Sequence, residues 1–192
     1  MKGLKKNLLL YFFSLIKSTK KMTKSRVLKV IIAGEGGVGK TTMLHRYIKG
    51  RFIEGLHMTI GVEFFLKELE MDGEKVMLQI WDFGGQERFR FLLKNYARGA
   101  KGALLMFDLT RPVTLENLEQ WVKICRDENP ELPIIFLGTK LDLFNLITIK
   151  DEFALIYKEM YNLFEFLKVS SKTGQNVDLA FELLAKEIIK SL

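Results

Sequence analysis

Apolar residues fall into short runs that alternate with amphipathic stretches from Val27 onward. Three runs are almost wholly apolar: VLKVIIA from Val27, GALLMFDLT from Gly102 and PIIFLGT from Pro133. Such runs are typical of parallel strands that are buried on both faces. Between the second and third runs, TLENLEQWVKIC predicts a helix whose apolar face is formed by Leu115, Leu118, Trp121, Val122 and Cys125. This alternation predicts an α/β fold with a mainly parallel sheet covered on both faces.

One segment breaks the alternation of strands with helices. VEFFLKELEMDGEKVMLQIWDF carries Asp72-Gly73 at its middle, which is a strong signal for a two-residue turn. The strands on either side are expected to pair antiparallel, toward one edge of the sheet. Farther along, TIKD (residues 148–151) resembles a capping box and predicts a helix start there. A last helix is expected from about Val177, with Phe181, Leu184 and Ile188 on its apolar face.

The net charge of +7 is concentrated at one end of the chain. Residues 1–26 hold eight basic residues and no acidic ones, which leaves 22 basic and 23 acidic residues in 27–192. The domain itself is therefore close to neutral, and no nucleic-acid partner is expected. The sequence divides into a basic and apolar N-terminal extension, 1–26, and one domain, 27–192. The single cysteine, Cys125, excludes an intramolecular disulfide and is expected in the core.

The N-terminal extension holds an apolar stretch, Leu8 to Ile16, between two clusters of lysine. Nine residues are too few to span a bilayer as a helix, and no small-x-small cleavage site follows them. One interpretation is a weak membrane contact through residues 1–21, with lysines facing anionic lipid. The alternatives are a disordered or packed extension, and translation that begins at Met22.

The segment GEGGVGKT, residues 34–41, fits the P-loop pattern G-x-x-x-x-G-K-[ST] between a predicted strand and a predicted helix. Its glycines let backbone N–H groups surround phosphate oxygens, and the helix N-terminus adds its positive end. Lys40 is expected to neutralise the β- and γ-phosphates, and the Thr41 hydroxyl to ligate Mg²⁺. The nucleotide-binding residues predicted here are Gly36, Gly37, Val38, Gly39, Lys40, Thr41 and Thr42.

A P-loop alone does not distinguish a kinase, an ATPase and a GTPase, and a second motif narrows the choice. WDFGGQE, residues 81–87, ends the second hairpin strand. Asp82 is then at the C-terminal tip of a strand, where it can hold Mg²⁺ through a water. Gly85 can offer its N–H to a γ-phosphate, and Gln86 can orient an attacking water. Gln86 and Lys40 are thus the predicted catalytic residues, and slow unaided hydrolysis is expected.

Five motifs, in their order and spacing, resemble the Ras superfamily of small GTPases, and the Rab branch most: GEGGVGKTT, TIGVEF, WDFGGQERFR, YARGAKGALLMFDLT and SSKTGQNV. The resemblance covers residues 27–192. It implies a P-loop NTPase fold with a six-stranded, mainly parallel sheet, one antiparallel edge hairpin and five flanking helices. It also implies a cytoplasmic switch, of the trafficking or signalling type, that binds GTP, GDP and Mg²⁺ and hydrolyses GTP slowly. Exchange factors, GTPase-activating proteins and effectors are the implied partners.

The resemblance assigns roles to further residues. Thr59 would complete the Mg²⁺ shell, and Phe52 would pack on the guanine, although a core position at the end of the first helix is its alternative. Backbone N–H groups of Ser170, Ser171 and Lys172 would meet guanine O6. Two departures stand out. Leu56 replaces a frequent aromatic lid, and Phe83-Gly84 makes DFGGQ resemble the Arf style.

The loop GTKLD, residues 138–142, is the predicted base-reading element. The carboxylate of Asp142 can accept from both N1–H and the exocyclic amine of guanine, whereas adenine offers an acceptor at N1. Lys140 can lay its stem along the base. Thr139 stands where relatives carry Asn, which would contact guanine N7 and tie this loop to the P-loop. Part of that brace is expected to be lost, with quicker GDP release, and Thr139→Asn should tighten GDP binding.

Two further expectations follow from residues that the chain lacks. The resemblance places no arginine beside the γ-phosphate. Three arginines lie nearby in the sequence, and surface positions are expected for them: Arg51, Arg88 and Arg90. An activating partner is therefore expected to supply an arginine or to reorder Gln86. No cysteine lies near the end of the sequence, so C-terminal prenylation is not expected.

Two other functions compete with a GTPase switch. A GTP-dependent binding module would hold the nucleotide with little or no hydrolysis, and the presence of Gln86 argues against it. A small P-loop kinase would need an acceptor pocket and an arginine-bearing lid, for which the sequence offers no segment.

Overall fold

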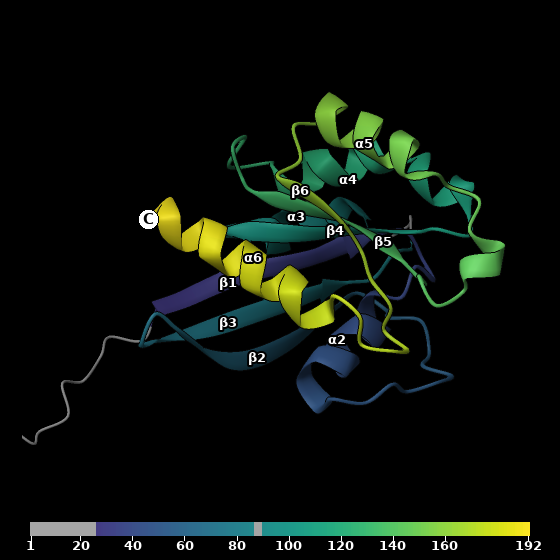
Figure 1. The fold of residues 1–192 in the computed structure, drawn as a ribbon. Helices are drawn as coiled ribbons and strands as arrows, with labels where there is room; N and C mark the ends of the chain where they lie inside the picture. The colour runs from purple at the N-terminus through teal and green to yellow at the C-terminus, as the bar shows by residue number, and fades with distance from the viewer. Residues whose placement is uncertain (1–25, 87–89) are drawn as a thin grey trace, which may run out of the picture.

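The computed structural model of the chain describes residues 26–86 and 90–192, which form a six-stranded sheet flanked by helices (Figure 1). The strand order is β2-β3-β1-β4-β5-β6. All neighbouring strands are parallel except β2 and β3, which pair antiparallel. The strands are β1 (Arg26–Gly34), β2 (Val62–Met71), β3 (Glu74–Phe83), β4 (Gly102–Asp108), β5 (Ile134–Thr139) and β6 (Glu165–Lys168). The predicted α/β architecture with one antiparallel hairpin is confirmed.

The hairpin turns where the sequence indicated. Asp72 and Gly73 have φ angles of 52° and 77°, and Met71 pairs with Glu74 across the turn. Two successive positive φ angles match the twist of the flanking strands, as in a type I′ turn. The hairpin places β2 at the edge of the sheet.

Five α-helices cover the sheet within the described residues, on both of its faces. They are α2 (Lys40–Lys49), α3 (Arg90–Ala97), α4 (Leu118–Cys125), α5 (Asp151–Met160) and α6 (Val177–Lys190), and α4 follows a short 3₁₀ helix, η2 (Pro112–Leu115). In Figure 1, α6 crosses in front of the central strands, whereas α3 and α4 lie behind them. Buried side chains of α2 and α6 pack on one face, and those of α3, α4 and α5 pack on the other.

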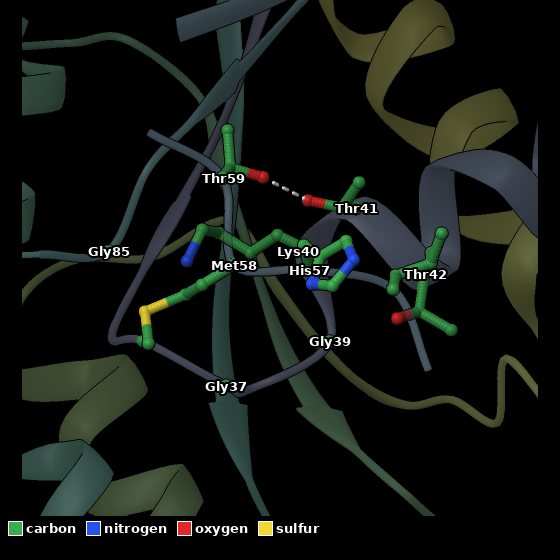
Figure 2. Close-up of a pocket in the computed structure, with 11 residues that line it drawn as sticks. Gly37, Gly39, Lys40, Thr41, Thr42, His57, Met58, Thr59 and Gly85 are labelled. Atoms are coloured by element: carbon green, nitrogen blue, oxygen red, sulfur yellow. Dashed lines mark hydrogen bonds between the residues drawn. The ribbon is translucent and has the colours of Figure 1, made fainter. Parts of the chain in front are cut away.

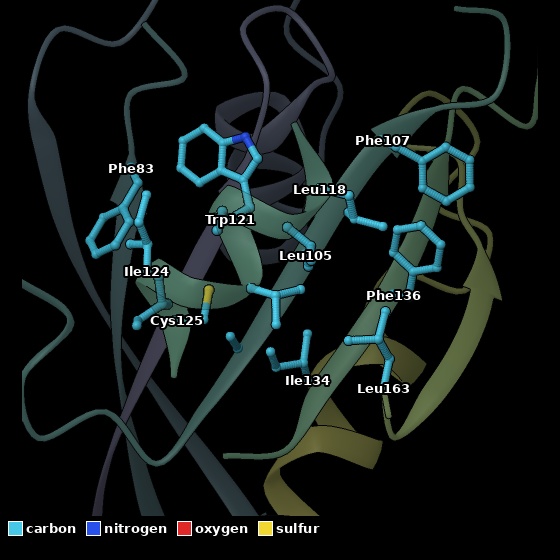
Figure 3. Packing of buried hydrophobic residues seen from close by; sticks show 14 of the residues in the cluster. Phe83, Leu105, Phe107, Leu118, Trp121, Ile124, Cys125, Ile134, Phe136 and Leu163 are labelled. Carbon is cyan, nitrogen blue, oxygen red and sulfur yellow. The ribbon is translucent and has the colours of Figure 1, made fainter. Parts of the chain in front are cut away.

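The predicted apolar face of the helix before β5 is buried as expected. Trp121 and Cys125 are 1% and 2% exposed, and they pack beside Leu105 and Ile134 from the strands (Figure 3). Burial raises the pKa of the Cys125 thiol to about 12, which makes this cysteine a core side chain rather than a reactive one.

The predicted capping box at Thr148 is wrong. Helix α5 begins at Asp151, and its N-cap residue is Lys150. The backbone N–H groups of Thr148 and Ile149 instead donate to the carbonyl of Leu109, at 3.0 and 3.2 Å. These bonds tie the segment to the end of β4, so the helix can begin only after it.

The predicted N-terminal extension lies outside the described residues, apart from Arg26. Within 26–86 and 90–192, no helix combines the length and the apolar character that crossing a membrane requires. The predicted site residues are gathered at one edge of the sheet, because β1, β3, β4 and β5 end there at Gly34, Phe83, Asp108 and Thr139. Ligands in such sheets bind outside the carboxyl ends of the strands.

Candidate nucleotide-binding site

Two adjoining cavities of about 420 and 430 Å³ open at the carboxyl ends of the strands. We call them the P-loop cavity and the GTKLD cavity. The P-loop cavity is lined by Gly36, Gly37, Gly39, Lys40, Thr41, Thr42, Leu56, His57, Met58, Thr59 and Gly85. The GTKLD cavity is lined by Gly37, Val38, Gly39, Thr42, Phe52, Ile53, Glu54, Gly55, Leu56, Thr139, Lys140, Asp142, Leu143, Ser171 and Lys172. Four residues line both, so the cavities form one continuous hollow.

The P-loop turns tightly around the side chain of Lys40. Gly37 and Gly39 have φ angles of 73° and 97°, a region that favours glycine, and Gly39 is the N-cap of α2. The Lys40 Nζ donates to the carbonyls of Gly34 and Glu35, both at 2.7 Å. Burial lowers the pKa of Lys40 to about 8, against the opposing effect of the Asp82 carboxylate. The P-loop therefore holds the ammonium group of Lys40 in place through two of its own carbonyl groups.

Three predicted metal ligands, Thr41, Thr59 and Asp82, lie close together, and Figure 2 shows the contact between the two threonines. The Thr41 Oγ1 lies 2.6 Å from the Thr59 Oγ1 and donates to the Asp82 Oδ2 at 2.5 Å. These residues come from α2, from the segment before β2 and from β3, so the fold brings them together. Burial raises the pKa of Asp82 to about 6, although the Thr41 hydroxyl and Lys40 favour its charged form. Its other oxygen, Oδ1, is buried and accepts no hydrogen bond from the described residues.

The two glycines of DFGGQ allow close backbone approach. A Cβ on Gly85 would lie 2.3 Å from the backbone nitrogen of Gly36, and one on Gly84 would lie 2.7 Å from the carbonyl oxygen of Thr59. The Gly84 N–H also donates to the carbonyl of Gly61 at 2.8 Å. The end of β3 therefore packs against both the P-loop and the segment that carries Thr59.

Gln86 lies beside this cavity. Its Nε2 donates to the Sδ of Met58 at 3.6 Å, and Met58 lines the cavity. The lining residues of the P-loop cavity, as far as the chain is described, do not include Gln86.

The GTKLD cavity gathers the predicted base-binding residues from four parts of the chain. Phe52 is half-buried and lines this cavity, which disagrees with its alternative assignment to the core. Ser171 and Lys172 also line it, whereas Ser170 is fully buried behind them. The Ser170 Oγ donates to the Asp142 Oδ1 at 2.6 Å. Ser170 thus orients the carboxylate that faces the cavity.

The expected loss of the brace at Thr139 is wrong. The Thr139 Oγ1 lies 2.7 Å from the carbonyl oxygen of Val38 in the P-loop and 2.9 Å from that of Phe107, and Thr139 is 3% exposed. Because the hydroxyl hydrogen is directed at these carbonyls, it is not available for guanine N7. Thr139 therefore retains the tie to the P-loop but not a contact with the base.

Lys140 adopts a conformation that is rare for a residue with a side chain. Its φ angle is 62°, and its Nζ lies 2.6 Å from the Oδ2 of the fully buried Asp108. Burial of Asp108 opposes its charge, but hydrogen bonds from Lys140 and Thr110 hold the pKa of Asp108 below its ordinary value. This ion pair fixes the turn that follows β5.

The expected surface position of Arg90 is wrong. Arg90 is 8% exposed, and its Nη2 and the Trp121 Nε1 both donate to the Glu35 Oε1, at 2.5 and 3.0 Å. Glu35, in the P-loop, thus holds the Arg90 guanidinium in a buried position. Gln120 also accepts a hydrogen bond from the Arg90 Nη1, at 2.6 Å. Arg51 is exposed as expected, and Arg88 lies outside the described residues.

Sequence reasoning missed Arg111 altogether. Its Nη2 donates to the carbonyl of Gly36 at 3.0 Å, and its Nε lies 3.2 Å from the Asp108 Oδ2. The only local signal was its position three residues after a strand-terminal aspartate. Neither motif nor periodicity indicates that the side chain reaches the P-loop.

The sequence of the chain is similar to those of known proteins of one family. Residues 29–190 match a family model described as the Ras family. The chain is 39% identical over 163 residues to Ras-related protein RABA2a of Arabidopsis thaliana, a match that covers 84% of this chain and 75% of that protein. It is 40% identical over 165 residues to Ras-related protein rab-11.1 of Caenorhabditis elegans, covering 85% and 78%. Ras-related protein Rab-19 of Bos taurus is 38% identical over 162 residues, covering 84% and 75%.

Proposed function

Because the chain belongs to the Ras family, it is a small GTP-binding protein that hydrolyses GTP, and we propose that its two cavities hold one guanine nucleotide. The observation that carries this proposal is that the cavities are continuous, with Gly37, Gly39, Thr42 and Leu56 lining both. Phosphates would occupy the P-loop cavity and the base the GTKLD cavity. The protein would act as a switch of the trafficking or signalling type, and a binding module without hydrolysis is not favoured.

We propose that Thr41, Thr59 and Asp82 hold Mg²⁺ beside the phosphates. The two hydroxyls and a buried carboxylate oxygen without a hydrogen-bond donor make a set of oxygens that suits this ion. Mg²⁺ keeps several waters and needs only one or two carboxylates besides phosphate oxygens. Within the described chain, no group of three or more His, Cys, Asp or Glu side chains could hold a metal ion. A Mg²⁺ site with one carboxylate does not need such a group. When bound, Mg²⁺ would neutralise charge on the β- and γ-phosphates.

For base recognition, we propose that Asp142 accepts from N1–H and the exocyclic amine of guanine, with Ser170 holding the carboxylate in place. Phe52 would pack on one face of the base and the Lys140 stem on the other. Backbone N–H groups of Ser171 and Lys172 would meet O6. ATP would leave the Asp142 carboxylate facing the lone pair of adenine N1, which explains the expected preference for GTP.

In the proposed reaction, a water attacks the γ-phosphorus while the bond to the β–γ bridging oxygen breaks. Lys40 and the P-loop N–H groups stabilise the charge that develops on the leaving phosphate oxygens. Gln86 would position the water after turning away from Met58, and slow unaided turnover is expected because a glutamine polarises water only weakly. An activating protein that reorders Gln86 or supplies an arginine would speed the reaction.

The output of the switch would be conformational. The γ-phosphate would bind Thr59 through the metal and Gly85 through its N–H, so that the segments around both residues are ordered by GTP and released by GDP. Exchange factors and effectors would read this difference. The relatives place the chain with the Rab type, and we propose that the Arf-like Phe83-Gly84 pair alters how closely these two segments pack.

Competition binding tests the base assignment. The full chain should bind fluorescent GDP, with displacement by GTP and at least ~100-fold weaker displacement by ATP. Asp142→Asn replaces one acceptor oxygen with a donor, so it should weaken GDP and strengthen the xanthine nucleotide, whose second carbonyl accepts. Asp151→Asn on α5 removes an exposed carboxylate that pairs with Lys168 and serves as the control. Equal displacement by ATP and GTP would refute the assignment.

Single-turnover hydrolysis tests the catalytic role. Gln86→Leu should slow GTP cleavage by ~10-fold or more while leaving GDP affinity unchanged. Gln79→Leu on β3 is a matched control, because Gln79 lines neither cavity in the part of the chain that the structure describes. Cleavage by Gln86→Leu at the wild-type rate would remove Gln86 from the mechanism.

We further propose a weak membrane contact through residues 1–21, which lie outside the described residues. The basis is the charge and apolar pattern of that stretch. Co-sedimentation with anionic liposomes should favour the full chain over a chain that starts at Met22. Equal sedimentation of the two would end this proposal.

A further inference from the structure

Arg111 contacts the P-loop with a side chain that lies outside both cavities. The residue follows β4 and precedes η2, and its Nη2 donates to the carbonyl oxygen of Gly36 at 3.0 Å. A Cβ built on Gly37 would lie 3.7 Å from one guanidinium nitrogen and 3.8 Å from another. Arg111 is absent from the described lining of both cavities. The guanidinium therefore contacts the outer surface of the same loop whose inner surface faces the cavity.

The contact acts on one particular peptide group. The carbonyl of Gly36 and the N–H of Gly37 belong to the same planar unit, and in a trans peptide they point in opposite directions. No cis peptide occurs in the described chain. When Arg111 holds the carbonyl outward, the N–H of Gly37 must point inward. Glycines flank this peptide on both sides, so little else in the local backbone restricts its rotation.

Asp108 holds the guanidinium in position. The Asp108 side chain is fully buried, and its Oδ2 lies 3.2 Å from the Arg111 Nε and 2.6 Å from the Lys140 Nζ. Its Oδ1 accepts from the N–H and the hydroxyl of Thr110, at 2.9 and 2.7 Å. The buried carboxylate of Asp108 thus binds both Arg111, which contacts the P-loop, and Lys140, which belongs to the GTKLD loop.

We propose that Arg111 is a positioning residue for the phosphates: it fixes the Gly36–Gly37 peptide so that the N–H of Gly37 faces the bound nucleotide. This inference rests on the proposed function, because it assumes phosphate in the P-loop cavity. The positive charge of Arg111 beside the loop adds a favourable field for phosphate. Arg111 lines neither cavity in the described part of the chain, so its effect on hydrolysis is exerted through the loop.

The test compares the full-length wild type with Arg111→Ala, Arg111→Lys and Arg98→Ala. Arg98 is the matched control, since it is an exposed arginine paired with Glu128. Arg111→Ala should release GDP about 5- to 20-fold faster, the range expected for one charged hydrogen bond that is partly exposed to water. The ³¹P resonance of the β-phosphate of bound GDP should also shift. Arg98→Ala should match the wild type in both measurements.

Arg111→Lys separates charge from geometry. A single Nζ can serve Asp108 or the Gly36 carbonyl but cannot span both as the guanidinium does. Its GDP release should therefore lie between those of the wild type and Arg111→Ala, and it provides the test if the alanine variant does not fold. Lowered thermal stability in Arg111→Ala with unchanged GDP release and an unchanged ³¹P resonance would show a structural role only and overturn the inference. Failure of the wild type to bind GDP would instead refute the proposed function.

Discussion

Replacing Thr139 with valine tests whether the hydroxyl is the brace between the two halves of the site. Valine keeps the shape of the side chain and removes the hydroxyl that now lies 2.7 Å from the carbonyl oxygen of Val38. Val38 is fully buried, so this carbonyl would lose its partner without access to water. An unsatisfied buried acceptor costs about 1–3 kcal/mol. A hydroxyl has one hydrogen to donate, so only one bond is lost, and we expect the lower part of that range.

The loss should appear in the nucleotide as well as in the fold. The freed carbonyl belongs to the P-loop, so Thr139→Val should lower the free energy of unfolding by about 1–2 kcal/mol and speed GDP release by roughly 5- to 30-fold. Urea denaturation of the nucleotide-free protein measures the first quantity. Stopped-flow release of fluorescent GDP measures the second.

Ile134→Val distinguishes the brace from general weakening of the same strand. Ile134 is fully buried in β5, and it lies at the end of the strand away from the P-loop. Its loss of one methylene should cost about 0.5–1.5 kcal/mol of stability without changing GDP release. Our reasoning would be refuted if the two variants changed GDP release equally, or if Thr139→Val released GDP at the wild-type rate. Thr139→Asn should now give little gain, because the tie to Val38 already exists.

Three further predictions use the same structure. Gly84→Ala would place a Cβ 2.7 Å from the carbonyl of Thr59, so the ratio of GTP to GDP affinity should fall by roughly 10-fold; an unchanged ratio in paired titrations would contradict this close packing. Cys125, whose pKa burial raises to about 12, should resist iodoacetamide at pH 8.5 until the protein is unfolded, and mass spectrometry of the native protein would reveal any rapid alkylation that contradicts this. Burial raises the pKa of Asp82 to about 6, so protons compete with Mg²⁺ as the pH falls; the Mg²⁺ concentration that slows GDP release by half should be higher at pH 5.5 than at pH 7.5, and an equal concentration at both would argue against Asp82 as a ligand.

The strand and helix pattern was predictable because it depends on local sequence. Buried parallel strands need continuous apolar runs, and the Asp72-Gly73 turn needs residues that tolerate positive φ angles. The P-loop was predictable for the same reason, since a strand, a glycine loop and a helix follow one another directly. The start of α5 was mispredicted, because the segment at Thr148 is fixed by a contact with Leu109 that no local pattern encodes.

The sequence by itself therefore determined the fold class, the family and many of the residues that line the two cavities. Tertiary structure alone decided how those residues are held. Thr139 meets Val38 across 101 residues of chain, Arg111 meets Gly36 across 75, and Arg90 meets Glu35 across 55. Each contact depends on which loops the parallel sheet brings together at its carboxyl edge and on whether one side chain spans the gap between them. The width of such a gap is set by the packing of whole helices and strands. No motif therefore indicates that Thr139 ties its loop to the P-loop or that Arg111 contacts the P-loop.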